Sequence, residues 1–320
     1  MTRIVVLDDY QNVALEIADW SSLSETCTTE IVNHHIEDEA DLVATLSGAE
    51  IVIAMRERTP FGEALLQKLP DLKLLITTGM VNRAIDMAAA RRQGVTVCGT
   101  PGGGSGAAEL AFGMMLALAR NIADETIRFR QKDPAWQTAV GIDLKGRVLG
   151  IVGFGRLGRH VARYAQAFGM DVAAWSRSLS AEVAAEHGVR RQETLEALLT
   201  EADFVSLHLP LTADTTGMIG TRELTAMKDT AYLVNTARGP LINEADLIDA
   251  LRKGVIQGAA LDVFDREPVS LDNPLRDLEN LIATPHIGYV TEDTYRVYFE
   301  GAIEAIQGWL KGEPVRVLNP

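Results

Sequence analysis

Short apolar runs alternate with amphipathic segments along most of the chain. In the first hundred residues this pattern predicts strands at residues 4–7, 51–54, 72–76 and 95–98, and helices at 39–46, 61–69 and 86–92. Beyond residue 147 it predicts six more strands, at 148–152, 171–175, 204–208, 231–235, 259–263 and 281–283. Apolar strands separated by helices are typical of parallel sheets that are covered on both faces. We therefore expect an α/β protein with two doubly wound parallel sheets.

Four other segments depart from this alternation. Residues 107–120 form an almost wholly apolar helical run, so we expect both sides of that helix to be buried. The polar stretch 121–146 follows, with Pro134 and Trp136, and residues 291–310 predict a single amphipathic helix. The glycine-rich run 101–105 is typical of a hinge between domains.

Composition narrows the class of protein. A chain of 320 residues with 47% hydrophobic residues is long enough for about two domains. Its formal net charge of −14 argues against nucleic acid as a partner, and no apolar run approaches the roughly 18–20 residues of a membrane span. The N-terminus begins a strand rather than a signal peptide, and Cys27 and Cys98 are the only cysteines. We expect a cytoplasmic protein without disulfides, membrane segments or a metal site.

A glycine-rich turn follows the strand at 148–152, in the order Gly153-Phe154-Gly155-Arg156-Leu157-Gly158. In a dinucleotide-binding domain the first glycine makes the turn, the second admits the pyrophosphate and the third packs the helix on the strand. The alternative is a chance glycine turn. The strand before it, the amphipathic helix after it and the six-strand series favour a nucleotide site.

The end of the next strand bears on the choice of cofactor. An acid is usual there in NAD sites, where it binds the ribose 2′-hydroxyl, but this chain has Ser176 and Arg177. Arg177 can pair with a 2′-phosphate, and Arg156 can add a second positive charge. This favours NADP. The alternative is that Arg177 is a solvated loop residue and that NAD is used.

Three ionisable residues each follow an apolar, strand-like run: Arg238, Glu267 and His286. A histidine can carry a proton near neutral pH, a neighbouring carboxylate can orient its ring and raise its pKa, and an arginine can hold a carboxylate with two N–H groups. Together with a nucleotide site, these residues predict hydride transfer between a 2-hydroxy acid and a 2-oxo acid. The alternatives are a structural Arg238–Glu267 ion pair and a turn-capping His286.

Several ordered motifs resemble those of the D-isomer-specific 2-hydroxyacid dehydrogenases, which include phosphoglycerate, glyoxylate/hydroxypyruvate and D-lactate dehydrogenases. The matching segments cover nearly the whole chain and are the glycine-rich turn, 207–210 (LHLP), 235–239 (NTARG), 261–264 (LDVF) with 267–268 (EP), and 284–288 (TPHIG). The resemblance implies a Rossmann cofactor domain at 101–288, inserted into a flavodoxin-like substrate domain of residues 1–100 and 289–320.

The resemblance also implies roles for further residues. Cofactor contacts are implied for His208, Pro210 and Thr236, and Asp262 would accept a hydrogen bond from the nicotinamide carboxamide. The loop with Gly79 and Met80 would offer backbone N–H groups to the substrate carboxylate, although Val81 and Asn82 depart from the usual family pattern. Arg56 and Arg58 follow another strand; Arg58 is a candidate contact for a substrate phosphate or second carboxylate, and the alternative is that both are surface arginines paired with Glu57.

The expected activity is therefore the NAD(P)-dependent interconversion of a D-2-hydroxy acid and its 2-oxo acid, as a glyoxylate- or hydroxypyruvate-like reductase. Two alternatives remain: a phosphoglycerate dehydrogenase-like enzyme that uses NAD, and a non-catalytic nucleotide sensor of the corepressor type. The family commonly dimerises, and we expect a homodimer formed through residues 107–146. The chain ends soon after its last helix, so we expect no appended regulatory domain.

Overall fold

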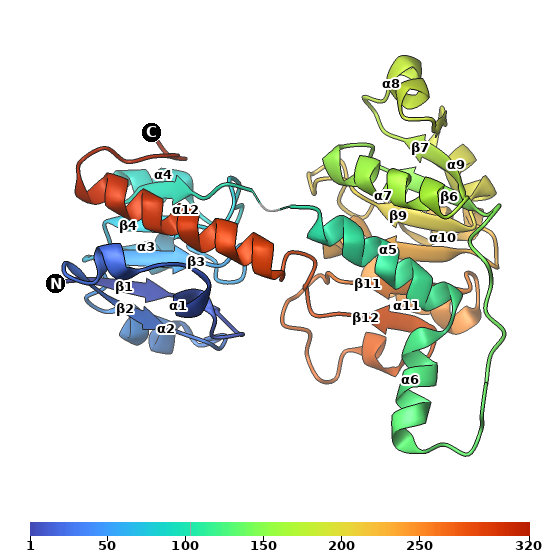
Figure 1. Cartoon of the computed structure of the whole chain (residues 1–320), viewed down its shortest axis with the longest axis horizontal. Coiled ribbons are helices and arrows are strands. Elements are labelled where there is room, and N and C mark those ends of the chain that lie inside the picture. The colour runs from blue at the N-terminus through green and yellow to red at the C-terminus, as the bar shows by residue number, and fades with distance from the viewer. Residues whose placement is uncertain (103) are drawn as a thin grey trace. The chain divides into compact units, whose positions relative to one another are not determined.

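A computed structural model describes residues 1–102 and 104–320 (Figure 1). By its internal contacts the chain divides into two compact units: unit 1 comprises Met1–Gly104 and Tyr289–Pro320, and unit 2 comprises Ser105–Gly288. The hinge expected at 101–105 includes Gly103, which lies outside the described residues.

Unit 1 is built on a five-stranded parallel sheet in the order β2-β1-β3-β4-β5. Its strands are β1 (Thr2–Val6), β2 (Cys27–Ile31), β3 (Ile51–Ala54), β4 (Leu74–Thr77) and β5 (Thr96–Gly99). This is the strand order of flavodoxin-like folds, in which the direction of winding reverses between β1 and β3. The order brings the loops after β1 and β3 together at the place where such sheets usually bind ligands.

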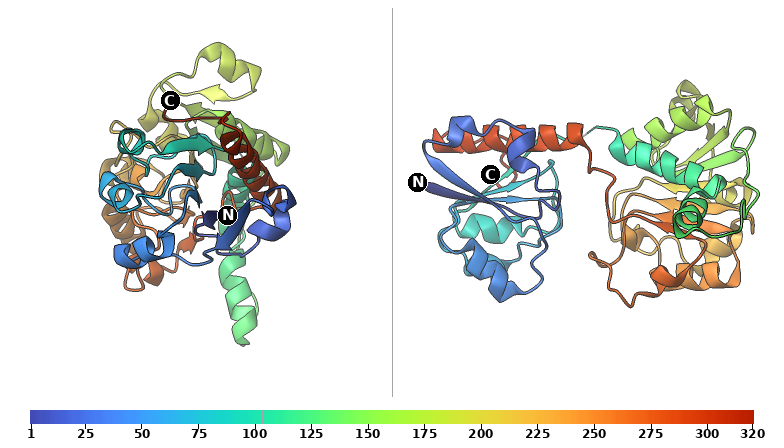
Figure 2. Two further views of the ribbon diagram at one scale, coloured as in Figure 1. Left: turned by 90° about the vertical axis from the view of Figure 1, so that its left-hand side faces the viewer. Right: turned by 60° about the horizontal axis from the view of Figure 1, so that its bottom comes forward.

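Helices cover both faces of this sheet, as Figure 2 shows. The helical elements of unit 1 are α1 (Ala14–Ile17), the 3-10 turn η1 (Ser21–Leu23), α2 (Glu39–Leu46), α3 (Glu63–Gln67), α4 (Met87–Arg92) and α12 (Glu292–Leu310). Apolar residues of α2, α3 and α4 share one core with the sheet, and those of α12 and α1 share the other. The strands other than the edge strand β2 are therefore largely apolar on both faces, as their sequences predict.

The last residues of the chain lie along the edge of the same sheet. Val317 forms an antiparallel bridge with Cys98 of β5, and Leu318 N donates to Val97 O at 2.8 Å. The Asn319 side chain accepts from Val97 N at 2.8 Å and donates to Val95 O at 2.9 Å. This segment satisfies backbone groups that an open edge strand would expose.

Unit 2 contains a seven-stranded parallel sheet in the order β12-β11-β10-β9-β6-β7-β8. Its strands are β6 (Val148–Val152), β7 (Asp171–Trp175), β8 (Arg190–Arg191), β9 (Phe204–Leu207), β10 (Tyr232–Asn235), β11 (Gly258–Leu261) and β12 (Leu281–Ala283). Numbered from β6, this is the Rossmann order extended by one strand. The predicted fold class, a doubly wound α/β protein with a Rossmann and a flavodoxin-like sheet, is confirmed.

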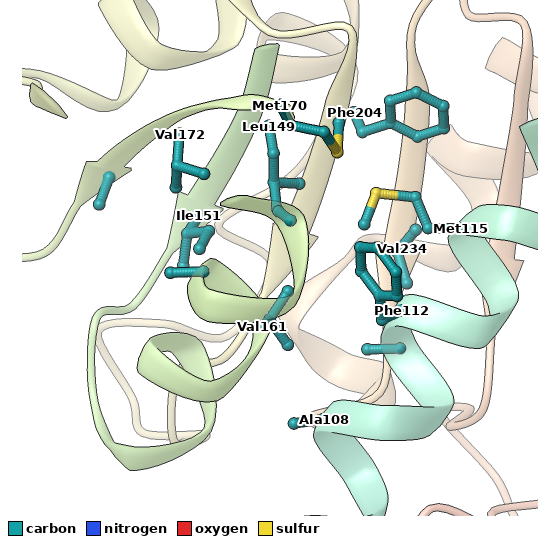
Figure 3. Close-up of a cluster of buried hydrophobic side chains, with 14 of the residues drawn as sticks. Ala108, Phe112, Met115, Leu149, Ile151, Val161, Met170, Val172, Phe204 and Val234 are labelled. Atoms are coloured by element: carbon teal, nitrogen blue, oxygen red, sulfur yellow. The ribbon is translucent and has the colours of Figure 1, made fainter. Parts of the chain in front are cut away.

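The helical elements of unit 2 are α5 (Gly106–Ala119), α6 (Ile122–Gln131), α7 (Arg156–Ala167), α8 (Ala181–Glu186), α9 (Leu195–Glu201), α10 (Thr221–Ala226), η2 (Gly239–Leu241), α11 (Glu244–Lys253) and η3 (Pro274–Asp277). α5 and α7 lie side by side on one face of the sheet (Figure 1). Phe112 and Met115 of α5 lie next to Val234 of β10 (Figure 3), and Ala108 and Ile151 belong to the same buried cluster. This burial explains the apolar composition of the α5 sequence.

The structure contains several elements that the sequence analysis did not predict. Among them are strand β2, helix α6, the two-residue strand β8 and the short helical elements α1 and η1. β2 is an edge strand with alternating burial, β8 is exposed, and α6 has no buried residue, so none of them carries an apolar run or stripe. No helix in the described part of the chain is long and apolar enough to cross a membrane.

Candidate functional site

The carboxyl ends of three neighbouring strands form the centre of the candidate site. β10, β11 and β12 are adjacent and parallel, and Asn235, Leu261 and Ala283 are partners across the sheet at the ends of these strands. The loops that follow them therefore leave from the same edge of the sheet. These loops carry Arg238, Glu267 and His286, so the fold brings the three residues to one edge.

His286 and Glu267 are bonded to each other. His286 Nδ1 lies 2.6 Å from Glu267 Oε2, and the Phe264 N–H donates to Glu267 Oε1 at 2.9 Å. An ionised carboxylate can only accept hydrogen bonds, so this contact places a proton on Nδ1. The side chains are 21% and 32% exposed, respectively, which leaves the pair accessible to a small molecule.

Arg238 lies in a turn that is fixed by Asn235. The Asn235 side chain donates to Arg238 O at 2.9 Å and accepts from Ala237 N at 3.0 Å, and Arg238 Nη1 donates to Ala237 O at 2.7 Å. Gly239 packs against the Phe264 carbonyl so closely that an added Cβ would lie 2.2 Å from its oxygen. The Arg238 turn is therefore packed against the segment that leads to Glu267.

Asp262 holds the turn that carries His286. Its fully buried carboxylate accepts from the Thr284 hydroxyl at 2.6 Å and from the Ile287 and Gly288 N–H groups at 2.8 Å each. Burial raises the pKa of Asp262, and these three hydrogen bonds oppose that rise. His286 has φ +54°, a left-handed conformation that is uncommon for residues other than glycine. The carboxamide contact expected for Asp262 stays a prediction; the visible role of Asp262 is to position His286.

The glycine-rich turn after β6 gives each glycine a different environment. Gly153 has φ +97°, and an added Cβ on Gly158 would lie 2.4 Å from Gly153 O, so both positions require glycine. An added Cβ on Gly155 would meet no protein atom within 4 Å. No side chain caps α7 at Gly155, and the starts of α1, α3, α5 and α6 likewise have no side-chain cap. The open approach and the uncapped helix fit the pyrophosphate of a dinucleotide.

The residues after β7 leave the choice of cofactor open. Ser176 is half-buried, Arg156 is exposed and Leu157 is half-buried. Arg177 is exposed, and its Nη1 lies 2.9 Å from Asp214 Oδ2. Arg177 is a solvated loop residue, as the NAD alternative supposes, and it also pairs with an acid from the loop after β9.

The other predicted cofactor residues lie on the same edge of the sheet. His208, directly after β9, is half-buried and bonds the Ser206 hydroxyl through Nε2 at 2.9 Å; burial lowers its pKa to about 4. The Thr236 hydroxyl lies 3.4 Å from Ala107 O. Pro210 is exposed, and its carbonyl accepts from Thr215 at 2.8 Å. His208 is thus held in the neutral form at physiological pH.

In unit 1, the side chain of Arg56 holds the predicted substrate loop after β4. Arg56 Nη1 donates to Thr78 O at 2.8 Å, and an added Cβ on Gly79 would lie 2.1 Å from the same nitrogen. The Gly79 N–H donates to Thr100 Oγ1 at 2.7 Å, so this donor is used within the unit. Met80 is 44% exposed, and no acceptor for its N–H occurs among the described residues. The substrate role of this loop stays a prediction.

Arg58 is held between the loops after β1 and β3. Its Nη1 donates to the carbonyl oxygen of Asp8 at 2.6 Å, and its guanidinium carbon lies 4.2 Å from the centre of the Tyr10 ring and 5.4 Å from that of Tyr289. The Asp8 carboxylate is buried and accepts from the Thr59 hydroxyl at 2.6 Å. Arg58 is therefore a partner of aromatic rings and a backbone carbonyl, and not a solvated surface arginine paired with Glu57.

Sequence reasoning missed the residues that support these loops. They are Asp8, Asn82, Thr284 and Asp214, and each of the four bonds a backbone or side-chain group of another loop. A polar residue one to three positions after an apolar strand was the available signal for Asp8 and Thr284. In the described part of the chain, no group of three or more His, Cys, Asp or Glu is placed to hold a metal ion.

Comparison with known proteins assigns the family. The model of the D-isomer specific 2-hydroxyacid dehydrogenase NAD binding domain matches residues 112–288. The chain belongs to the D-isomer-specific 2-hydroxyacid dehydrogenases. These are oxidoreductases that act on CH–OH donors with a nicotinamide cofactor, so the expected class of enzyme is confirmed.

Three relatives illustrate the similarity. A glyoxylate reductase of Thermococcus litoralis is 39% identical over 264 residues, which are 80% of this chain and 79% of that protein. A D-3-phosphoglycerate dehydrogenase of Methanocaldococcus jannaschii is 36% identical over 314 residues. These are 98% of the present chain but only 58% of the Methanocaldococcus protein. A crystal structure of a putative D-3-phosphoglycerate dehydrogenase oxidoreductase from Ralstonia solanacearum has a TM-score of 0.95 and 36% identity, with 100% of this chain and 97% of that one covered.

Gly155→Ala tests the pyrophosphate approach. The added methyl group meets no protein atom, and the backbone of Gly155 (φ −85°) suits alanine, so we expect the free energy of unfolding to change by less than about 0.5 kcal/mol. We expect the Kd for NADH and NADPH to rise at least about tenfold, because the methyl group occupies the anion's approach. Fluorescence titration measures the Kd. Gly113→Ala, at another open glycine, is the control and should bind both cofactors normally.

His208 predicts a pH dependence of stability. As the pH falls below 6.5 the unfolded chain protonates this histidine, whereas the folded chain resists protonation until about pH 4. Stability is therefore present above the ordinary pKa and is lost between pH 6.5 and 4. In His208→Gln, the fall in the free energy of unfolding from pH 7 to pH 5 should be smaller by about 2 kcal/mol, as measured by urea titration. An equal reduction in His34→Gln, at an exposed histidine, would contradict this assignment.

Proposed function

We propose that this dehydrogenase reduces a small, unphosphorylated 2-oxo acid of the glyoxylate or hydroxypyruvate type to the D-2-hydroxy acid. The observation that carries the proposal is the His286–Glu267 pair at 2.6 Å, at the same sheet edge as the Arg238 turn and the glycine-rich turn. A proton carrier, a carboxylate-binding arginine and a nucleotide loop are the groups that this reduction requires.

The residues divide the chemistry between them. A bound NAD(P)H supplies the hydride that adds to C2 of the oxo acid. His286 donates the proton from Nε2 to the carbonyl oxygen of the substrate, while Glu267 keeps the ring oriented through Nδ1. Arg238 holds the substrate carboxylate with its planar N–H groups and polarises the carbonyl. In the oxidative direction His286 Nε2 accepts the hydroxyl proton.

The two arginines of unit 1 support an unphosphorylated substrate. Arg56 is bonded to Thr78 O and lies 3.7 Å from the Glu57 carboxylate, and Arg58 is bonded to Asp8 O beside the Asp8 carboxylate. A dianionic phosphate is usually recognised by several arginines or lysines whose charge is not already balanced by acids. The acids next to both arginines therefore favour glyoxylate or hydroxypyruvate over a phosphorylated acid.

For the cofactor we propose NADPH, with NADH as a second substrate. Ser176 presents no negative charge to a 2′-phosphate, and Arg177 lies directly beside it with an exposed guanidinium. The pair of Arg177 with Asp214 is exposed and screened by water, so a phosphate can replace that carboxylate more easily than it could replace Glu57 beside the less exposed Arg56. The proposal for a cytoplasmic enzyme rests on Cys27 and Cys98, which are both buried and free.

We propose that residues 107–146 form a homodimer interface. α6 has no buried residue, and large apolar side chains of this segment are exposed: Ile122 (51%), Ile127 (51%), Phe129 (73%), Trp136 (77%) and Val140 (98%). A second copy of the chain would remove this apolar surface from water, which is the usual reason for such a patch.

The dimer predicts a change of mass in a surface variant. Phe129→Ser combined with Trp136→Ser should convert a dimer into a species of 34.7 kDa in analytical ultracentrifugation, because it removes the two largest exposed rings of the segment. Leu271→Ser, at a leucine that is 90% exposed outside this segment, is the control and should leave the mass of a dimer. A wild-type chain that sediments as a monomer would refute the proposed dimer.

His286→Ala tests the assignment of the proton donor. We expect kcat for oxo-acid reduction to fall about 10²- to 10⁴-fold, because general acid catalysis is lost. The assay follows NADPH and NADH absorbance with glyoxylate, hydroxypyruvate, pyruvate, phenylpyruvate, oxaloacetate and phosphohydroxypyruvate. His34→Ala, at an exposed histidine of unit 1, is the matched control.

The same panel separates the alternatives. A higher kcat/KM for phosphohydroxypyruvate than for hydroxypyruvate would refute the argument from Arg56 and Arg58. Turnover that survives His286→Ala unchanged would remove this residue as the acid. Cofactor binding without turnover of any oxo acid would favour the nucleotide-sensing alternative.

A further inference from the structure

An ion pair spans the strand ends next to the glycine-rich turn. Arg177 Nη1 lies 2.9 Å from Asp214 Oδ2, and the two side chains are 66% and 73% exposed. Arg177 is the second residue after β7, whereas Asp214 lies in the loop after β9. The pair therefore joins two loops that are 37 residues apart in the sequence.

The order of the strands places this pair over β6. β6 lies between β9 and β7 in the sheet, and neighbouring strands are about 4.8 Å apart. A contact between the loops after β9 and β7 must therefore pass across the carboxyl end of β6. The glycine-rich turn starts at that end, with Gly153 directly after Val152. The pair consequently lies at the edge of the proposed dinucleotide site.

The loop that carries Asp214 is fixed by internal hydrogen bonds. Thr215 is buried, and its hydroxyl donates to Pro210 O at 2.8 Å and accepts from Thr212 N at 2.8 Å. The Thr216 hydroxyl donates to Thr212 O at 2.8 Å. Asp214 therefore extends from a closed turn, and its carboxylate stays within reach of Arg177 while the loop keeps this shape.

We propose that Asp214 is a specificity-determining residue that competes with the 2′-phosphate of NADP(H) for Arg177. The inference rests on the proposed function, since it deepens the choice of cofactor at the same site. The phosphate must replace the Asp214 carboxylate as the partner of the guanidinium, and it approaches that carboxylate as a like charge. A 2′-hydroxyl is uncharged, so it neither has to displace Asp214 from Arg177 nor is repelled by the carboxylate. Asp214 thereby lowers the preference for NADPH that Ser176 and Arg177 alone would create.

The exposure of Arg177 and Asp214 determines how strongly Asp214 affects NADPH binding. An exposed ion pair contributes little, because water and salt screen it, so a dianionic phosphate can displace Asp214. Removal of the carboxylate also removes its repulsion of the phosphate. Both changes act on NADPH and leave NADH nearly unaffected.

The test is the near-isosteric substitution Asp214→Asn in the full chain. Fluorescence or calorimetric titration at pH 8 measures the Kd for NADPH and for NADH without any turnover. We expect the Kd for NADPH to fall about three- to tenfold, and that for NADH to change by less than about twofold. The gain should shrink at 0.5 M salt, because screening weakens both the pair and the repulsion.

Two controls separate competition for Arg177 from a general change of charge. Asp249→Asn removes a carboxylate with a similar exposure, paired with Lys253 on α11 in the same unit, and should leave both Kd values unchanged. In the Arg177→Ala background, Asp214→Asn should improve NADPH binding by less than about twofold. A full gain in that background would assign the effect to long-range charge and overturn the proposal.

The outcomes also distinguish this inference from the proposed function. If the wild-type chain binds both cofactors and Asp214→Asn gives the same NADPH Kd as Asp249→Asn, the inference is wrong while the reductase proposal stands. If the wild-type chain binds neither NADPH nor NADH, both are refuted.

Discussion

The candidate site depends on one buried carboxylate, that of Asp262 at the end of β11. A buried charge is strongly destabilising unless several donors surround it, and here the donors are the Thr284 hydroxyl and the amides of Ile287 and Gly288. All three belong to the segment after β12, so the need to satisfy Asp262 determines the path of that segment. His286 lies within this segment. Asp262 thus fixes the backbone at His286, and Glu267 then orients the imidazole ring.

The same construction recurs at other strand ends of the protein. Asn235 bonds both sides of the Arg238 turn after β10, and Asn82 donates to Arg56 O at 2.6 Å and to the Thr77 hydroxyl at 2.9 Å in unit 1. In each case a side-chain amide or carboxylate makes hydrogen bonds beyond the strand end, where no neighbouring strand is present to make them. Residues with left-handed backbones follow the ends of β1, β3 and β12, namely Asp8, Arg56 and His286. Such backbones persist where the surroundings impose them, as they do at these loops.

The sequence predicted the fold well where burial leaves an apolar pattern. The apolar strands at the centre of both sheets and the helices that cover them were visible, because a parallel sheet buried on both faces excludes polar residues. β2 (Cys27–Ile31) escaped prediction because it is an edge strand that includes Thr28, Thr29 and Glu30. α6 escaped because none of its residues is buried, so its sequence carries no apolar stripe for a core.

The sequence revealed those site residues whose side-chain chemistry alone suggests a function. Arg238, Glu267 and His286 stand out because ionisable residues seldom follow apolar strands without a reason. Thr284 and Asp214 do not stand out, since their partners lie 22 and 37 residues away and only the strand order brings them close. The structure also changed the interpretation of Arg58, which the sequence could not distinguish from a solvated arginine.

The pairing of the last residues with β5 has a consequence for the synthesis of the protein. Unit 1 needs α12 and the segment at Val317–Asn319 to cover one face and one edge of its sheet, and both are synthesised after unit 2. Unit 2, at Ser105–Gly288, is complete in sequence before them. The nascent chain therefore holds a finished nucleotide-binding unit while an unfinished sheet at its N-terminus still exposes apolar strands. Such surfaces are the substrates of chaperones, so unit 1 stays a chaperone substrate until α12 and Val317–Asn319 have been added.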